Sequence, residues 1–140
     1  MRMRKTAYIC FGMIGLSLLS TSCVTRRNLE KSGGLDMRLV QNRQVKVWGS
    51  AWEENGALTV AGSVRPRSPE KGTEAGHLHV TIRERTGNEF AAQVIKLRRI
   101  EARKRVPDVI KFSVPFASIP PKLSIIRLEW HAGVNCPATR

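Results

Sequence analysis

The sequence has few acidic residues, few aromatic residues and no catalytic motif. Of its 140 residues, 24 are Lys or Arg and 11 are Asp or Glu, and aromatic residues make up 6%. It contains no nucleophile elbow, no Gly-rich phosphate loop and no HExxH pattern. The acidic pair Glu53 and Glu54 falls in a predicted turn and has no matching base. We therefore expect no enzyme and no cofactor.

The sequence also lacks an apolar run long enough to span a membrane comfortably, which takes about 20 residues. Its longest such run covers residues 7–19, which are preceded by Arg2, Arg4 and Lys5 and followed by small polar residues at 20–22. A charged start, a short apolar middle and a small-residue exit are the layout of a secretory signal peptide. We expect residues 1–22 to be that peptide.

The end of this leader, residues 19–23 (Leu-Ser-Thr-Ser-Cys), resembles the lipobox of bacterial lipoprotein precursors. The resemblance implies that Cys23 is acylated and becomes the mature N-terminus of a lipid-anchored protein of the bacterial envelope, facing the periplasm. Leu19 stands one place earlier than the lipobox leucine. An ordinary secretory leader and an uncleaved N-terminal anchor are the alternatives. Val24, in place of an Asp, favours the outer membrane over the inner one.

Residues 23–44 are polar and include Gly33 and Gly34, so we expect a lipidated N-terminus followed by a flexible linker. A short helix over residues 35–40 is the alternative for part of this segment. If Cys23 is acylated and Cys10 leaves with the leader, Cys136 is the one thiol that remains. If Cys23 is not acylated, a disulfide between Cys23 and Cys136 could form in an oxidising compartment.

The remaining sequence alternates between apolar and polar residues in short segments separated by turn signals. Strands are predicted at residues 45–52, 57–64, 77–85, 89–97, 109–114 and 123–131. Asn55 and Gly56 between the first two are a strong hairpin signal, since both tolerate positive φ. The pattern predicts an all-β fold, a small antiparallel β-sandwich over residues 45–133, followed by a C-terminal tail, 134–140. Strand number and spacing resemble immunoglobulin-like and fibronectin type III-like sandwiches. The predicted core is Leu78, Val80, Ile82, Ile110, Phe112 and Leu128.

All three histidines fall in predicted strands. His77 and His79 project from the same face about 7 Å apart, so both imidazoles could reach one Cu or Zn ion. His131, with Glu129 beside it, could supply a third ligand. In a sandwich, however, the two strands can belong to different sheets or be separated by a third strand. We therefore expect no convergent three-histidine site and keep a periplasmic Cu- or Zn-binding protein as the alternative function.

The excess of positive charge favours anionic partners. Without the leader, the chain has 21 basic and 11 acidic residues, a formal net charge of +10. Residues 96–105 hold six cations and one acid, and we expect part of this run to be exposed. The candidates for contacting an anionic surface are Arg98, Arg99, Arg103, Lys104 and Arg105. The other interpretation of the run is a solvated hairpin that discourages edge-to-edge aggregation.

We expect the partners to be the membrane through the lipid anchor, an anionic lipid or envelope glycopolymer, or another protein. Nucleic acid is not expected, because the basic run lacks the interleaved aromatic residues that stack on bases. Trp48 and Trp52 share a strand face, and an exposed pair would indicate a partner-binding patch. The expected function is a non-catalytic binding or structural module of the envelope. A soluble secreted module that binds anionic glycopolymers is a further alternative.

Overall fold

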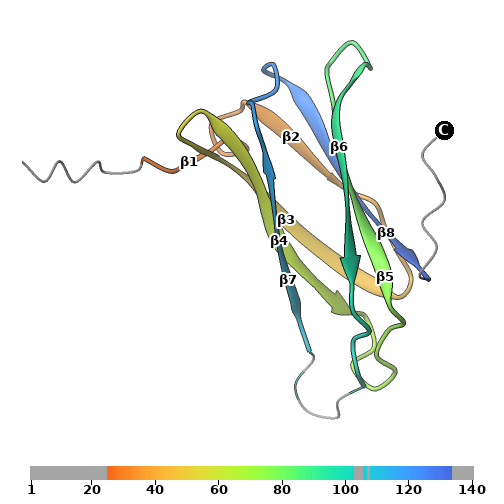
Figure 1. The fold of residues 1–140 in the computed structure, drawn as a ribbon. Helices are drawn as coiled ribbons and strands as arrows, with labels where there is room; N and C mark the ends of the chain where they lie inside the picture. The colour runs from red at the N-terminus through yellow and green to blue at the C-terminus, as the bar shows by residue number, and fades with distance from the viewer. Residues whose placement is uncertain (1–24, 103–105, 107, 134–140) are drawn as a thin grey trace, which may run out of the picture.

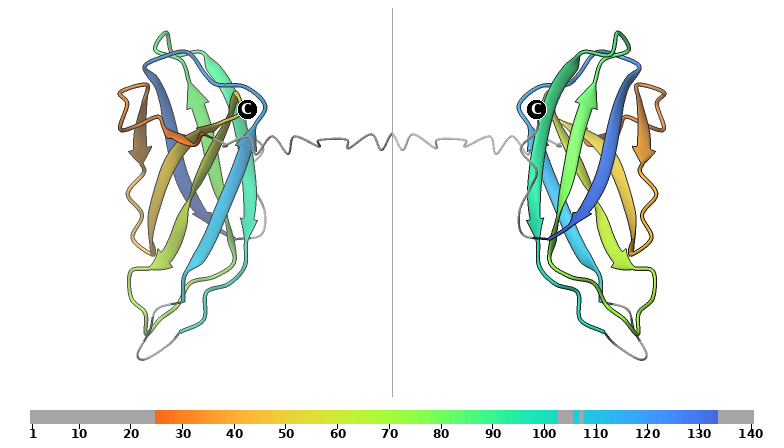
Figure 2. Two further views of the ribbon diagram at one scale, coloured as in Figure 1. Left: turned by 90° about the vertical axis from the view of Figure 1, so that its left-hand side faces the viewer. Right: turned by 90° about the vertical axis from the view of Figure 1, so that its right-hand side faces the viewer.

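The computed structural model describes residues 25–102, 106 and 108–133, and their strands form two four-stranded sheets packed face to face (Figures 1 and 2). This confirms the predicted all-β sandwich. The predicted signal peptide, Cys23 and the C-terminal tail lie outside the described residues. In the described part of the chain, no helix is long and apolar enough to cross a membrane. The strands are β1 (Arg27–Asn28), β2 (Leu35–Leu39), β3 (Val45–Glu54), β4 (Ala57–Pro66), β5 (Gly76–Arg83), β6 (Glu89–Leu97), β7 (Ile110–Phe116) and β8 (Ser124–Ala132).

The first sheet has the order β1-β3-β4-β7 and the second the order β2-β8-β5-β6. The pairs of the first sheet are antiparallel, as are β5 with β6 and β5 with β8. In contrast, β2 runs parallel to β8, so the second sheet is mixed rather than antiparallel as predicted.

The six predicted strands correspond to β3 through β8, with boundaries shifted by at most two residues. The hairpin between β3 and β4 turns at Asn55 (φ 54°) and Gly56 (φ 77°). Two consecutive residues in the left-handed region are the geometry that the Asn-Gly pair predicts, because its twist matches that of the flanking strands.

Residues 27–39 differ from the expected linker, because they belong to the sandwich. Asn28 pairs with Trp52, and β2 pairs with β8 from Leu35 opposite Ser124 onward. Leu29 and Leu35 are buried in the core. The physical reason is that apolar and polar residues alternate from Leu35 to Leu39, which suits a strand beside a buried neighbour. The domain therefore begins near residue 27 and not at residue 45.

The core lies between the sheets, where the inward-facing side chains of alternate positions meet. Five of the six predicted core residues are buried, and Ile110 is half-buried against the same cluster. Gly49 and Gly62 are register partners on β3 and β4, and the ring of Phe112 packs close to both. A side chain at Gly62 would overlap this ring, and one at Gly49 would meet Leu128.

The sandwich has two ends of different character. One end carries β1 and the hairpin turns at residues 55–56 and 84–88. The other end carries three connections, at residues 40–44, 67–75 and 98–109. In Figure 2 the connection between β4 and β5 lies at the lower end and β1 in the upper half.

Candidate functional site

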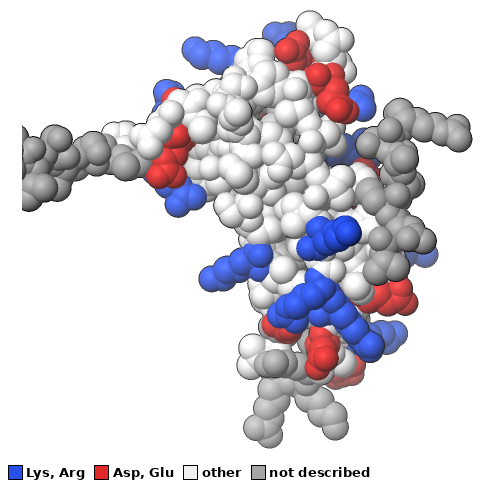
Figure 3. Space-filling model, in the orientation of Figure 1, with Lys and Arg blue, Asp and Glu red and all other residues white. Residues whose placement is uncertain are grey.

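Positive charge gathers at the end of the sandwich formed by connections 40–44, 67–75 and 98–109, together with the strand residues that enter and leave them. We call it the basic end. Of its described residues, nine are Lys or Arg and four are Asp or Glu. On the face shown in Figure 3, several Lys and Arg side chains gather over the lower half of the molecule. The nine are Arg43, Lys46, Arg65, Arg67, Lys71, Lys96, Arg98, Arg99 and Lys111, and the four acids are Glu70, Glu74, Glu101 and Asp108.

The opposite end of the sandwich is balanced in charge. We call it the balanced end. It includes six Lys or Arg and six Asp or Glu among the described residues, and Figure 3 shows both colours in its upper part. Arg38 in β2, and Arg127 and Glu129 in β8, lie farther along their strands and are counted at neither end. The surplus of positive charge among the described residues is therefore concentrated at one end. The opposite set is Arg26, Arg27, Lys31, Arg83, Arg85 and Lys122 with Glu30, Asp36, Glu53, Glu54, Glu84 and Glu89.

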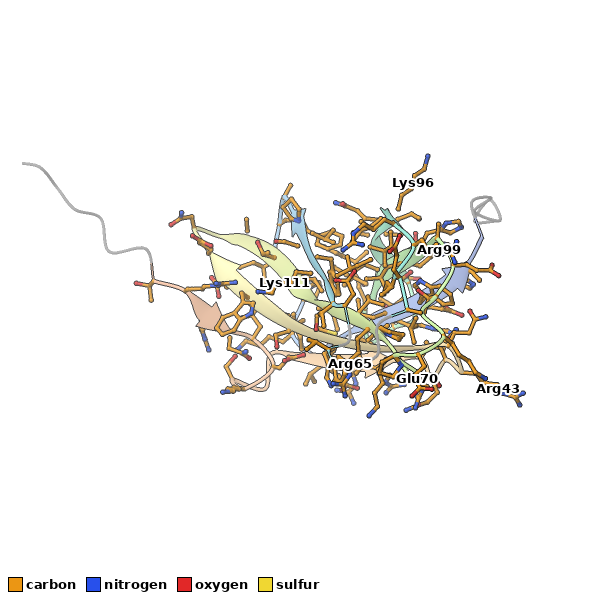
Figure 4. The ribbon with its side chains drawn as sticks, turned by 90° about the horizontal axis from the view of Figure 1, so that it is seen from below. Arg43, Arg65, Glu70, Lys96, Arg99 and Lys111 are labelled. Atoms are coloured by element: carbon orange, nitrogen blue, oxygen red, sulfur yellow. The ribbon has the colours of Figure 1, made fainter. Side chains whose placement is uncertain are left out.

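The basic end contains a cleft of about 480 Å³ whose wall includes Arg43, Lys71 and Arg99, one from each connection. All three side chains are exposed, and none forms an ion pair with another described residue. The rest of the wall is polar, with Glu74 as its one acid. Figure 4, which looks onto this end, shows Arg43 and Lys96 pointing outward on opposite sides.

Backbone hydrogen bonds hold two of the three connections together beneath the cleft. The Thr73 amide donates to the Ile100 carbonyl at 2.8 Å, and the Ile100 amide donates to the Thr73 carbonyl at 3.1 Å. Ile100 is buried, which fixes this point to the core. Gly72 (φ +62°) packs so closely on Ile100 that a Cβ would meet its carbonyl oxygen. Lys71 and Arg99 therefore project from a backbone that hydrogen bonds and core packing hold in place.

The five predicted surface-binding residues of the basic run have different outcomes. Arg98 is exposed and forms an ion pair with Asp108 at 3.0 Å, so part of its charge is compensated. Arg99 is exposed and lines the cleft. The remaining three, at positions 103–105, lie outside the described residues. Arg43 and Lys71 were missed, since each stands in a different connection and neither belongs to a sequence cluster.

Trp48 lies on the outer face of the first sheet beside the basic end and is 39% exposed. The Arg65 guanidinium lies 4.2 Å from its ring centroid and the Lys46 Nζ 5.8 Å. Trp52, on the same face, is half-buried with Arg26 4.5 Å from its ring centroid, toward the balanced end. An exposed aromatic ring flanked by cations is typical of a surface that contacts a partner.

The three histidines lie together, contrary to our expectation that His131 would be out of reach. β5 and β8 are hydrogen-bonded neighbours, and His77 stands directly opposite His131. The ring centroids of His77 and His79 are 5.9 Å apart, and those of His79 and His131 are 4.7 Å apart. Among the described residues, however, no group of three or more His, Cys, Asp and Glu side chains is already spaced to hold a metal ion.

The electrostatics of the histidine cluster favour a neutral imidazole at His79. Burial lowers the pKa of His79, and the neighbouring His131 and His77 lower it further, against the opposing effect of Glu129. The Oε1 atom of Glu129 lies 3.6 Å from the Nε2 atom of His131. A neutral imidazole is the form that can accept a hydrogen bond or bind a metal ion.

Comparisons of the chain with protein-family models, with curated proteins and with solved structures find no match. The function is therefore inferred from geometry and chemistry.

Proposed function

We propose that this chain is a lipid-anchored envelope protein that binds an anionic glycopolymer with its basic end. The observation that carries the proposal is the polarity of charge along the sandwich, with nine cations against four acids at the basic end and six against six at the opposite end. Charges of one sign at one site attract and orient an oppositely charged polymer.

The place of β1 argues for a polymer rather than the lipids of the anchoring membrane. β1 begins at Arg27, four residues after Cys23, and an extended chain of four residues spans at most about 14 Å. β1 pairs with the last residues of β3, whereas the basic end lies at the first residues of that strand. Lipidation at Cys23 would thus hold the balanced end at the bilayer and direct the basic end away by roughly 25 Å, at about 3.3 Å per strand residue.

The side chains at the basic end suit a polymer that carries carboxylate or phosphate groups on sugar rings. Arg43 and Arg99 offer planar guanidinium groups that can bind such anions through two parallel hydrogen bonds. Trp48, on the outer face of the first sheet, is 39% exposed with Arg65 over its ring, and the part of the ring left exposed gives an aromatic surface against which a sugar can pack. A simple phosphate site would not need this aromatic surface.

A charge-reversal experiment tests the proposal. Arg43, Lys71 and Arg99 are changed together to Glu, and the matched control reverses Arg27, Arg83 and Lys122 at the balanced end. Both variants lose the same net charge at exposed positions. Binding of the full chain in detergent to alginate, a uronate polymer, is measured from 20 to 300 mM salt.

We expect the basic-end variant to bind alginate at least tenfold more weakly and the control to lose much less. Binding should also fall steeply with salt, because exposed charges are screened beyond about 10 Å at 0.1 M. Equal losses in the two variants would contradict the proposal. Preference for anionic phospholipid vesicles over alginate would identify the leaflet as the target instead.

The anchor has its own test. Cys23→Ser should abolish fatty-acid labelling and move the protein from the membrane fraction to the soluble fraction. Wild-type fractionation of this variant, with the mature N-terminus at another residue, would contradict lipidation at Cys23.

A further inference from the structure

We propose that His77, His79 and His131 form a binding site for Cu²⁺ or Zn²⁺ on the outer face of the second sheet. They project from two adjacent strands, with His77 opposite His131 and His79 opposite Glu129. Directly opposite residues have Cβ atoms about 4.5–5.5 Å apart, and residues two apart on a strand about 7 Å. Three imidazoles based at these positions can reach one ion.

The burial of His77 points to a ligand. Its side chain is 2% exposed, although it stands on the outer face of the sheet. Its Nε2 is buried and has no hydrogen-bond partner among the described residues. Buried imidazole nitrogens are normally satisfied, since leaving one without a partner costs free energy. Coordination to a metal ion would satisfy this atom.

Binding requires the rings to turn, since the described side chains are not already spaced as ligands. Zn–N bonds of about 2.0–2.1 Å place tetrahedral ligand nitrogens roughly 3.3 Å from one another. The closest pair of rings, those of His79 and His131, is 4.7 Å apart between centroids and tilted by 59°. The χ2 torsion of histidine has a broad minimum, so the rings of the half-buried His79 and His131 can turn toward His77.

The charged neighbours of the histidine cluster have opposing effects on the binding of a cation. Glu129 favours a cation and can hold His131 in place as an outer-shell acceptor, a usual companion of metal-bound histidine. Arg127 engages Glu129 at 3.1 Å, and Lys96 stands opposite His77 on β6, so both oppose a cation. Lys96 is exposed and can extend into solvent. With three nitrogen ligands the site should prefer Cu²⁺ to Zn²⁺.

Calorimetric titration of the full chain in detergent at pH 7.5 tests the proposal, with CuSO₄ and ZnCl₂ in separate experiments. We expect one ion per chain, a sub-micromolar Kd for Cu²⁺ and a weaker Kd for Zn²⁺. His79→Gln and His131→Gln should each raise the Kd at least tenfold. These half-buried positions are chosen so that the variants fold, which circular dichroism checks.

With Cys23 acylated and Cys10 removed with the leader, the Cys136 thiol is the one that could also bind these ions, so the control variant replaces Cys136 with Ser. Its Cu²⁺ affinity should equal that of the wild type. As a second readout, imidazole ¹⁵N signals of all three histidines should shift together on addition of Zn²⁺. A Kd above about 100 µM, or wild-type affinity in the doubly substituted His79→Gln, His131→Gln variant, would overturn the proposal.

Discussion

Replacing Gly62 by Ala should destabilise the fold strongly, whereas the same change at its register partner Gly49 should be tolerated. The two glycines face each other on β3 and β4, both toward the core. A Cβ at Gly62 would meet the Trp48 carbonyl oxygen, the Gly49 Cα at 2.7 Å and the Phe112 Cζ at 2.8 Å. Two of these three atoms are backbone, so the overlap can be removed only if β3 and β4 move apart.

The magnitudes follow from which atoms can move. Normal carbon contacts are about 3.5–4.0 Å, so the Gly62 methyl would overlap its neighbours by roughly 1 Å. Overpacking costs about 1–3 kcal/mol when the surroundings can adjust and more when they cannot, so we expect a loss of at least about 3 kcal/mol. A Cβ at Gly49 would come within 2.5 Å of Leu128 Cδ1, the end of a flexible side chain. Part of that cost is offset, because Ala is favoured over Gly within a strand by about 0.5–1 kcal/mol, leaving a net loss of about 0–2 kcal/mol.

Urea unfolding followed by tryptophan fluorescence measures both variants, and the buried Trp130 reports on the core. A domain stability of about 5–15 kcal/mol makes a loss of 3 kcal/mol readily visible. Equal losses at Gly62 and Gly49, or a loss below about 1 kcal/mol at Gly62, would refute the described close approach of β3 and β4.

Two further predictions concern stability. Phe112→Ala should lower the free energy of unfolding in urea by about 3–5 kcal/mol, because it removes a buried ring. The control Lys111→Ala, on the exposed face of β7, should change it by less than about 0.5 kcal/mol. Similar losses in the two variants would mean that the register of β7 is misassigned. Burial and the nearby Asp36 raise the pKa of Glu30, against a hydrogen bond from Ser50 that lowers it, so folding disfavours its charged form and wild-type stability should fall as pH rises above 4.5. Glu30→Gln should therefore have a higher melting temperature than wild type at pH 7, by a margin that shrinks below pH 4.5, and a margin independent of pH would contradict the assignment.

Most of the fold could be predicted from local pattern. The Asn55-Gly56 turn and the alternation from Leu78 to Ile82 are short-range signals, and the structure follows both. β2 was not predicted as a strand because its alternation covers only five residues, too short a run to stand out in the polar segment after Gly33 and Gly34. Its partner β8 begins at Ser124, and no local rule indicates a parallel pairing over so long a stretch of chain.

The candidate sites depend on contacts that sequence alone does not specify. The pair His77 and His79 was visible from its spacing, but the approach of His131 depends on β8 lying next to β5. The cleft likewise exists because connections from three parts of the chain meet at one end, each supplying a single cation. A search for basic clusters in the sequence finds Arg99 and overlooks the other two.

If Cys23 is lipidated, the start of the domain near residue 27 limits which surfaces its basic end can reach. A flexible linker of about 20 residues has a typical span of roughly 25 Å, enough for the domain to turn its basic end toward its own membrane. With β1 starting at Arg27 and paired to β3, three residues remain between the anchor and the first sheet. The balanced end is then held near the bilayer and the basic end is directed outward. Under this proposal, the same cations that a tethered domain could use on lipid headgroups face away from the membrane, where an anionic polymer can reach them.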